Sequence, residues 1–261
     1  MPTVTIQAPT GLSAHERIPR QDRLHPTPAL PAPVPRPVGV FASDPAQAAK
    51  LLHPLVSIDL SAVDPAWSVR IHLLSPVEPY DDYFADGAEA YHSYYTRRNW
   101  IGFRLGEDSR YELLGDWRCF QAMSEDKTRS QDPELLEHYA KQQQSFDEVK
   151  AAYAERGLLM NVDLGKREGE AQMLKYRLAF LEDWKESQGA GNWADPDLFP
   201  LEFVDNPEMD WEDAFPLTED GRPFRFVAAV PGWNYRDGGA DQILLFYDPQ
   251  TRVALQTFEW S

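Results

Sequence analysis

A loop near the C-terminus, Pro231 to Asp241 (PGWNYRDGGAD), holds residue types that often line a small-ligand site. Its glycines, Gly232, Gly238 and Gly239, would let the backbone approach a ligand closely. Its aromatic and charged side chains could stack on a ligand and contact its polar groups, and they are Trp233, Tyr235, Arg236, Asp237 and Asp241. A long loop between two strands also needs glycines simply to turn. The loop therefore predicts either a ligand site or a structural connection.

Metal-ligating and nucleophilic residues are sparse in the chain. Glu89 and His92 are three residues apart and could share one helix face, which makes half a metal site at most. Cys119 lies in the strand-like sequence DWRCFQ, which is typical of a small buried hydrophobic side chain rather than a nucleophile. The sequence therefore favours a protein with no catalytic residue, no metal and no cofactor.

Short motifs of familiar enzyme classes do not occur in the sequence. The chain lacks G-x-G-x-x-G, G-x-x-x-x-G-K-[S/T], H-E-x-x-H and G-x-S-x-G. Dinucleotide binding, P-loop chemistry, zinc-protease chemistry and the α/β-hydrolase mechanism consequently have no local support. Together these absences favour a binding protein over an enzyme.

The segment from Glu182 to Asp220 carries thirteen acidic residues against Lys185 alone, a net charge of −12 within a total of −17. Aromatic residues are interleaved with the acids, although a purely solvated acidic loop should be poor in them. Either the aromatics pack the loop onto the core while the acids face water, or both together form a partner-binding face. The residues predicted for that face are Asp205, Glu208, Asp210, Trp211, Glu212, Asp213 and Phe215.

The net charge of −17 limits the classes of partner. Long-range electrostatics would repel nucleic acid and anionic membranes, and would attract a basic protein. No apolar stretch reaches the 18 residues of a membrane span, and the N-terminus lacks the apolar run of a signal peptide. The single cysteine, Cys119, excludes an internal disulfide framework and suits a reducing compartment. The expected location is the cytoplasm.

The candidate residues depend on strands near the C-terminus for their positions. Between Gly221 and Ser261, three apolar segments and two turns predict an antiparallel three-stranded meander. The run from Ile243 to Tyr247 is apolar on both faces, as in a strand buried inside a sheet. Asp248 and Pro249 predict a type I turn before the last strand. In the first strand, one face is expected to hold Phe224, Phe226, Ala228 and Val230.

Upstream of the meander, the patterns predict a mixture of strands and helices. Strands are expected at 67–74, 99–105 and 111–120, the first with Arg70 and His72 on its wet face. A short helix is expected at 46–52, and a long amphipathic helix from Asp132-Pro133 to Gly157. A further helix is predicted at 168–187. Residues 1–40 are rich in proline and predict an extended arm, which is either a spacer or a ligand for an aromatic-lined groove.

The stretch from Phe215 to Asp248 resembles part of the YwqG-like bacterial family, whose pattern is D-G-x-P-φ-x-F-φ-A-Q followed by D-x-x-φ-L-x-F-F-Y-D. Ala229 replaces the usual Gln, and Phe215-Pro216 stands where that family has Trp-Pro. The match covers about 35 of the 261 residues. The resemblance implies an α+β sheet protein of poorly known function, and some similar proteins are immunity proteins that neutralise toxins. The matching residues are Pro216, Asp220, Gly221, Pro223, Phe226, Ala228, Asp241, Leu244, Phe246, Tyr247 and Asp248.

These observations predict an α+β fold with a mainly antiparallel sheet, one or two packed amphipathic helices and an extended Pro-rich N-terminal arm. Residues 1–40 are assigned to the arm and residues 41–261 to a single domain. The predicted function is that of a cytoplasmic, acidic protein-binding protein, an immunity or antitoxin-like stoichiometric inhibitor of a basic toxin or enzyme. The alternative is a small-molecule-binding protein or enzyme that uses the Pro231 to Asp241 loop.

Overall fold

The computed structural model describes residues 32–33, 36–62, 64–79, 83–156, 191–207 and 211–260. The predicted helix at 168–187 and most of the Pro-rich arm lie outside these ranges. Within them the fold is α+β with antiparallel sheets, as the sequence predicts.

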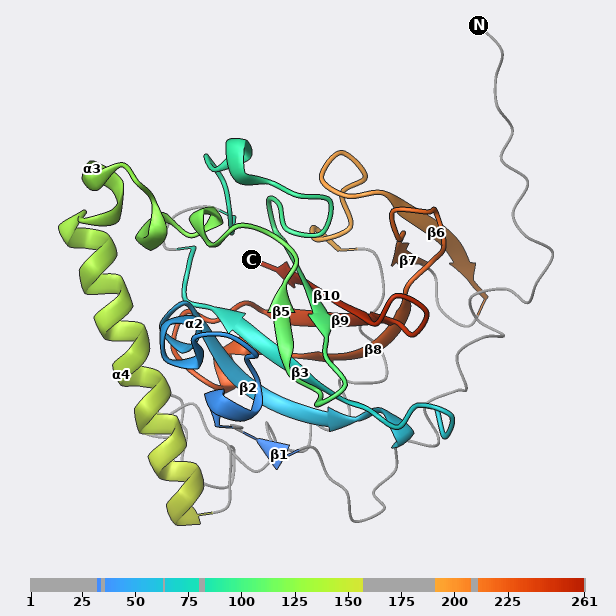
Figure 1. The fold of residues 1–261 in the computed structure, drawn as a ribbon, viewed down its shortest axis with the longest axis horizontal. Coiled ribbons are helices and arrows are strands. Elements are labelled where there is room, and N and C mark those ends of the chain that lie inside the picture. The colour runs from blue at the N-terminus through green and yellow to red at the C-terminus, as the bar shows by residue number, and fades with distance from the viewer. Residues whose placement is uncertain are drawn as a thin grey trace, which may run out of the picture.

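A five-stranded antiparallel sheet forms the centre of the fold (Figure 1). Its strand order is β5-β4-β10-β9-β8, so the last strand in the chain occupies the middle. The predicted C-terminal meander is confirmed, because β8, β9 and β10 are consecutive neighbours. The strands are β4 (Trp100–Leu105), β5 (Tyr111–Leu113), β8 (Arg225–Val230), β9 (Gln242–Asp248) and β10 (Val253–Glu259).

Both faces of this sheet are buried. In β9, Ile243 and Leu245 pack into a larger core on one face, whereas Leu244 and Phe246 pack into a smaller core on the other. Burial on both sides explains why the run from Ile243 to Tyr247 is apolar without alternation. The turn after β9 also forms as expected, with the Asp248 carboxylate accepting hydrogen bonds from the backbone of Gln250 and Thr251.

The expectation of a single face for the apolar residues of β8 is wrong. Phe224 and Phe226 lie in the smaller core, but Ala228 and Val230 lie in the larger one. The pairing register between β8 and β9 shifts between Phe226 and Ala228. A β-bulge inserts one extra residue and so moves every following side chain to the opposite face.

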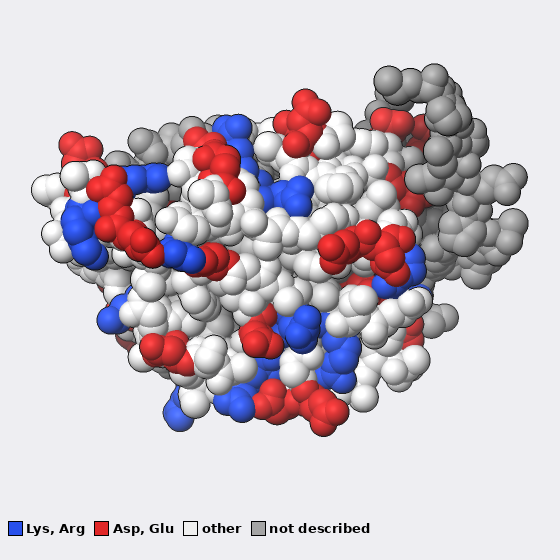
Figure 2. All heavy atoms as spheres, turned by 45° about the horizontal axis from the view of Figure 1, so that its top comes forward, with Lys and Arg blue, Asp and Glu red and all other residues white. Residues whose placement is uncertain are grey.

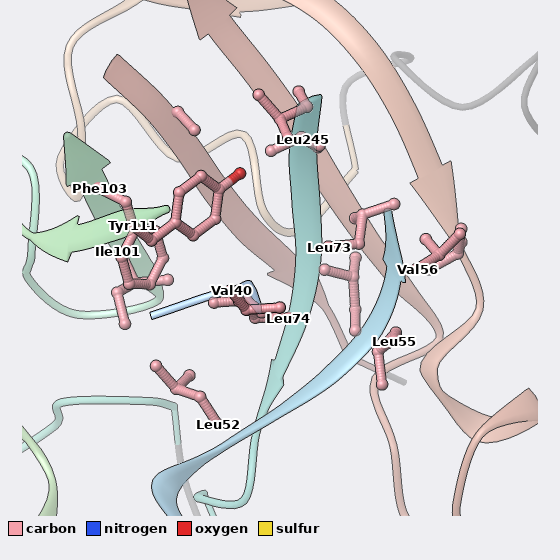
Figure 3. Packing of buried hydrophobic residues seen from close by; sticks show 14 of the residues in the cluster. Val40, Leu52, Leu55, Val56, Leu73, Leu74, Ile101, Phe103, Tyr111 and Leu245 are labelled. Atoms are coloured by element: carbon pink, nitrogen blue, oxygen red, sulfur yellow. The ribbon is translucent and has the colours of Figure 1, made fainter. Parts of the chain in front are cut away.

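A three-stranded sheet covers the larger core, in the order β1-β2-β3. The strands are β1 (Ala32–Pro33), β2 (Leu52–Asp59) and β3 (Arg70–Pro76). Strand β2 was not predicted, because Pro54 lies within it; the proline is accommodated where the register shifts between Pro54 and Val56. Figure 3 shows part of this core, to which both sheets contribute side chains: Val40, Leu52, Leu55, Val56, Leu73, Leu74, Ile101, Phe103, Tyr111 and Leu245.

Three helices are described, and two of them match the sequence prediction. Helix α2 (Pro45–Leu51) begins after Asp44, whose carboxylate accepts a hydrogen bond from the backbone of Gln47. The short helix α3 (Lys127–Ser130) precedes the long helix α4 (Pro133–Arg156), which runs along one side of the molecule in Figure 1. The buried stripe of α4 contains Leu135, Phe146 and Val149, whereas Leu136 is 53% exposed.

The strand predicted at 111–120 is wrong beyond Leu113. Two 3-10 helices follow instead, η5 (Trp117–Cys119) and η6 (Gln121–Met123). The carboxylate of Asp116 accepts a hydrogen bond from the backbone of Arg118, and this cap favours a turn over a strand. In the described part of the chain, no helix combines the length and the apolar character that a membrane span requires.

Candidate functional site

The acidic segment contains a two-stranded hairpin formed by β6 (Leu201–Asn206) and β7 (Trp211–Pro216). Asp205 lies directly opposite Glu212, and Phe203 lies opposite Ala214, so these residues share one face. Both acids are exposed, and the Phe203 side chain is 39% exposed. Ala214 is buried in the smaller core, so the accessible part of this face presents two opposed carboxylates beside the exposed ring of Phe203.

Two residues on the other face of the hairpin are turned inward, which corrects part of the predicted binding face. Asp213 and Phe215 are buried, each with 1% exposure. The Asp213 carboxylate accepts hydrogen bonds from the side-chain amide of Asn206 at 3.2 and 3.3 Å. These two side chains cannot contact a partner while the hairpin is folded. Glu208, Asp210 and the side chain of Trp211 lie outside the described residues.

Most of the described aromatic residues of the acidic segment pack onto the core. Trp193 and Phe199 are buried in the smaller core, where Phe199 stacks on Trp100 with ring centroids 4.4 Å apart. These two rings therefore follow the interpretation in which the aromatic residues pack the segment onto the core. Phe203 does not, because its ring is exposed at the surface. Figure 2 shows acidic side chains spread over much of the face in view, interspersed with Lys and Arg. Charge alone therefore does not single out a site, and the hairpin is distinguished by its exposed ring.

The loop from Pro231 to Asp241 is closed by its own backbone. Gly232 donates its N–H to the carbonyl of Ala240 at 2.8 Å, and Gly239 lies against the Gly232 backbone. A Cβ atom on Gly239 would come within 2.4 Å of the Gly232 carbonyl carbon. At these two positions the glycines are required by close packing of backbone on backbone, which is the structural alternative for this loop.

Two of the predicted ligand contacts in this loop point into the protein. Tyr235 and Arg236 are buried, and the Arg236 guanidinium donates a hydrogen bond to the carbonyl of Pro76. The prediction that these two side chains contact a ligand is therefore wrong, because both lie in the interior of the protein. Trp233, Asp237 and Asp241 are partly exposed, and the backbone N–H of Asp237 donates to Ser145 on α4.

Arg236 belongs to a buried polar cluster that the sequence did not reveal. Its Nε and Nη1 groups have no hydrogen-bond partner, and burial lowers the Arg236 pKa to about 10. Nearby, His53 contacts Gln143 at 3.3 Å and stacks on Phe146. Burial and the positive charge of Arg236 lower the pKa of His53 to about 3. His53 is therefore neutral at physiological pH.

Glu78 is a second buried charge, and its contacts indicate a structural role. Its carboxylate accepts hydrogen bonds from the backbone of Gln121 and Ala122 and from the Tyr139 hydroxyl. Burial raises the pKa of Glu78. The three donors join η6 and α4 to the chain that follows β3. This arrangement connects segments rather than opening to a ligand.

The residues considered for metal binding and thiol chemistry are engaged elsewhere. His92 contacts the carbonyl of Ala85 at 3.0 Å, whereas Glu89 accepts from the backbone of Gly87. The Cys119 thiol donates to the carbonyl of Tyr91, and burial raises the Cys119 pKa to about 12, so the thiol stays protonated at neutral pH. Among the described residues, no group of three or more potential ligands could hold a metal ion.

A pocket of about 530 Å³ lies beside β2 and β3. At its floor, Ser57 and His72 are cross-strand partners, with the Ser57 hydroxyl 2.8 Å from Nδ1 of His72. Nε2 of His72 is 3.0 Å from the carbonyl of Ser109. Because a carbonyl only accepts, Nε2 carries the proton and Nδ1 accepts from Ser57. Residues around the pocket include Arg36, Ser57, Asp59, Arg70, His72 and Ser109.

Sequence reasoning placed His72 on the wet face of its strand, and this expectation is wrong. His72 has 2% exposure, because Ser109 and Tyr111 cover it. Burial lowers the pKa of His72 to about 4. The alternation of β3 correctly placed His72 and Arg70 on the face opposite Ile71. It could not show that residues from the turn before β5 close over that face.

Comparison of the chain with models of protein families, with curated proteins and with solved structures finds no match. The likeness to the YwqG-like family therefore rests on its motif residues alone and remains a prediction.

Proposed function

We propose that this protein binds a basic protein through the exposed face of the β6–β7 hairpin. The observation that carries the proposal is the pairing of Asp205 with Glu212 beside the exposed ring of Phe203. Like charges directly opposite each other destabilise a sheet. A lysine or arginine from a partner would remove this repulsion, and the ring offers an apolar anchor next to it.

The net charge of the chain supports the same kind of partner. A charge of −17 attracts a basic protein over long distances and speeds its association. Fast association is the property that a stoichiometric inhibitor needs most. Our proposal is therefore an immunity or antitoxin-like protein that acts in the cytoplasm and occludes a basic toxin or enzyme. The same charge opposes binding to nucleic acid and to anionic membranes.

The proposal is tested by affinity capture with paired bait proteins. The wild-type chain should enrich a basic protein from cells of the native host, and the double variant Asp205→Lys with Glu212→Lys should lose it. The control is Glu107→Lys with Glu112→Lys, which changes the net charge equally at two exposed acids outside the hairpin. If both double variants lose the partner, net charge alone determines its binding. If both variants still capture it, the hairpin is not part of the binding interface.

The contribution of the aromatic ring is measured on the purified partner. Phe203→Ala should accelerate dissociation and weaken affinity by about 2 kcal/mol, as expected for an apolar anchor in an interface. Leu136→Ala is the matched control, because Leu136 is another exposed apolar residue and lies on α4, at the opposite end of the molecule in Figure 1. Equal dissociation rates for wild type and Phe203→Ala would remove the hairpin from the interface.

A further inference from the structure

We propose that the pocket beside β2 and β3 binds a small anionic molecule, with a phosphate or carboxylate group held between Arg36 and Arg70. This site is separate from the hairpin and does not depend on the function proposed for it. The volume of about 530 Å³ is within the range of small-molecule sites.

The distribution of ion pairs in the pocket gives it an available positive charge. Arg36 and Arg70 line the pocket, and neither forms an ion pair with any described residue. Of the two carboxylates in the pocket, Asp108 pairs with Arg110 at 2.6 Å. Asp59 accepts hydrogen bonds from the neutral Ser61 and keeps its negative charge directly opposite Arg70 in the strand register. The two guanidinium groups outnumber this one carboxylate, which leaves the pocket a net positive charge for a ligand.

Hydroxyl groups in the pocket can complete the coordination of an oxyanion. Ser109 accepts a hydrogen bond from the backbone of Arg70, which leaves its hydroxyl proton available to a ligand. Ser68 also lines the pocket and is exposed. Arginine presents its donors in a planar fork that matches phosphate and carboxylate oxygens. Two arginines with neighbouring hydroxyls fit such a group better than they fit a neutral or cationic one.

The floor of the pocket is fixed before any ligand arrives. The backbone N–H of His72 donates to the Tyr111 hydroxyl, which in turn donates to the His72 carbonyl. The imidazole is held at both nitrogens by Ser57 and Ser109. A ligand therefore meets a preformed surface and does not have to order it, which reduces the free-energy cost of binding.

Isothermal titration calorimetry of the full chain tests the proposal, with inorganic phosphate, adenosine 5′-monophosphate and citrate as probes. Saturable binding of at least one probe is expected, and a preference for the phosphates or for citrate identifies the group that the arginines hold. Arg36→Gln and Arg70→Gln should each weaken binding by about tenfold or more, since each removes charge-assisted hydrogen bonds. Arg104→Gln, at an exposed arginine of β4 outside the pocket, should bind as wild type does.

A second measurement locates the ligand in the pocket. Titration with the probe that binds should shift the imidazole NMR signals of His72 in the wild type, and in Arg70→Gln the same shift should require about tenfold more probe or more. The proposal is overturned if no probe binds below about 10 mM. It is equally overturned if Arg36→Gln and Arg70→Gln, folded by circular dichroism, bind as tightly as Arg104→Gln.

Discussion

Ser57 donates its hydroxyl proton to Nδ1 of His72 across 2.8 Å, and the carbonyl of Ser109 fixes the remaining ring proton on Nε2. His72 should therefore be neutral and protonated at Nε2 at pH 7, which two-dimensional ¹H–¹⁵N correlation of the ring measures directly. Ser57→Ala should cost about 1–3 kcal/mol of unfolding free energy, because Nδ1 becomes a buried acceptor without a donor. An imidazolium signal, or a ring protonated only at Nδ1, would contradict this assignment.

The two buried histidines should make the protein less stable in mild acid. The pKa values of His72 and His53 are lowered to about 4 and about 3 from an ordinary value of 6.5. Between the folded and unfolded pKa values, the unfolded chain binds protons that the folded chain does not. The contribution of these histidines to the free energy of unfolding is therefore fully present above pH 6.5 and is lost as the pH falls. At pH 4.5, each histidine should lower the free energy of unfolding by about 2–3 kcal/mol relative to neutral pH.

Urea denaturation at pH 7.5 and pH 4.5 checks this dependence, with His53→Gln and His72→Gln as test variants. Each variant should be less sensitive to pH than the wild type, because it lacks one of the groups that takes up a proton on unfolding. Unchanged sensitivity in both variants would mean that the carboxylates alone account for acid destabilisation.

The opposed acids of the hairpin should be a measurable cost to stability. Glu212→Lys replaces a repulsive cross-strand pair with an attractive one and should stabilise the protein by about 0.2–1 kcal/mol. Glu202→Lys is the matched control, because Glu202 is an exposed acid of the same hairpin that lies opposite Phe215. The difference between the two variants should shrink in 1 M salt. Equal stabilisation by both would indicate a response to net charge rather than to the pair.

Backbone packing in the Pro231 to Asp241 loop predicts opposite outcomes for two glycine substitutions. Gly239→Ala should destabilise the protein by more than about 2 kcal/mol, because the new methyl group would overlap the Gly232 backbone. Gly39→Ala should change the unfolding free energy by less than about 0.5 kcal/mol, since no atom lies within 4 Å of its Cβ position. Thermal and urea denaturation measure both. A Gly239→Ala protein as stable as Gly39→Ala would show that the loop yields easily.

The last strand should be indispensable to the core. Phe258 is fully buried in the larger core, so Phe258→Ala should cost about 3–5 kcal/mol of unfolding free energy. Removal of residues 257–261 should leave protein that is insoluble or lacks a cooperative thermal transition, because β10 pairs with both β4 and β9. A truncated chain that melts cooperatively near the wild-type temperature would contradict this expectation.

The sequence predicted those elements whose local pattern decides their structure. The apolar run of β9, the alternation of β10 and the proline at the start of α4 are local signals, and all three elements form. The bulge in β8 was not predicted, because an alternating pattern assumes a constant register. Strands β6 and β7 were also missed, since acidic residues are depleted in strands and read as a loop.

The candidate sites were predictable only in part, because tertiary contacts decide which side chains are accessible. Asp205 and Glu212 are exposed as expected, but Asp213 on the same hairpin is buried. The pocket was missed entirely. Its floor joins Ser57, His72 and Ser109, which are distant in sequence and meet only when β2 pairs with β3 and the turn before β5 folds over them.

The central position of β10 constrains when the main sheet can form during protein synthesis. The hydroxyl of Thr257 bonds to the carbonyl of Asn99, a residue 158 positions earlier in the chain. Strands β4 and β5 therefore leave the ribosome long before the strand that joins them to β9 exists. Until β10 emerges, the edge of β4 is unpaired and open to other chains, and such long-range pairing is slow. Translation must accordingly proceed through the β10 codons before the five-stranded sheet closes.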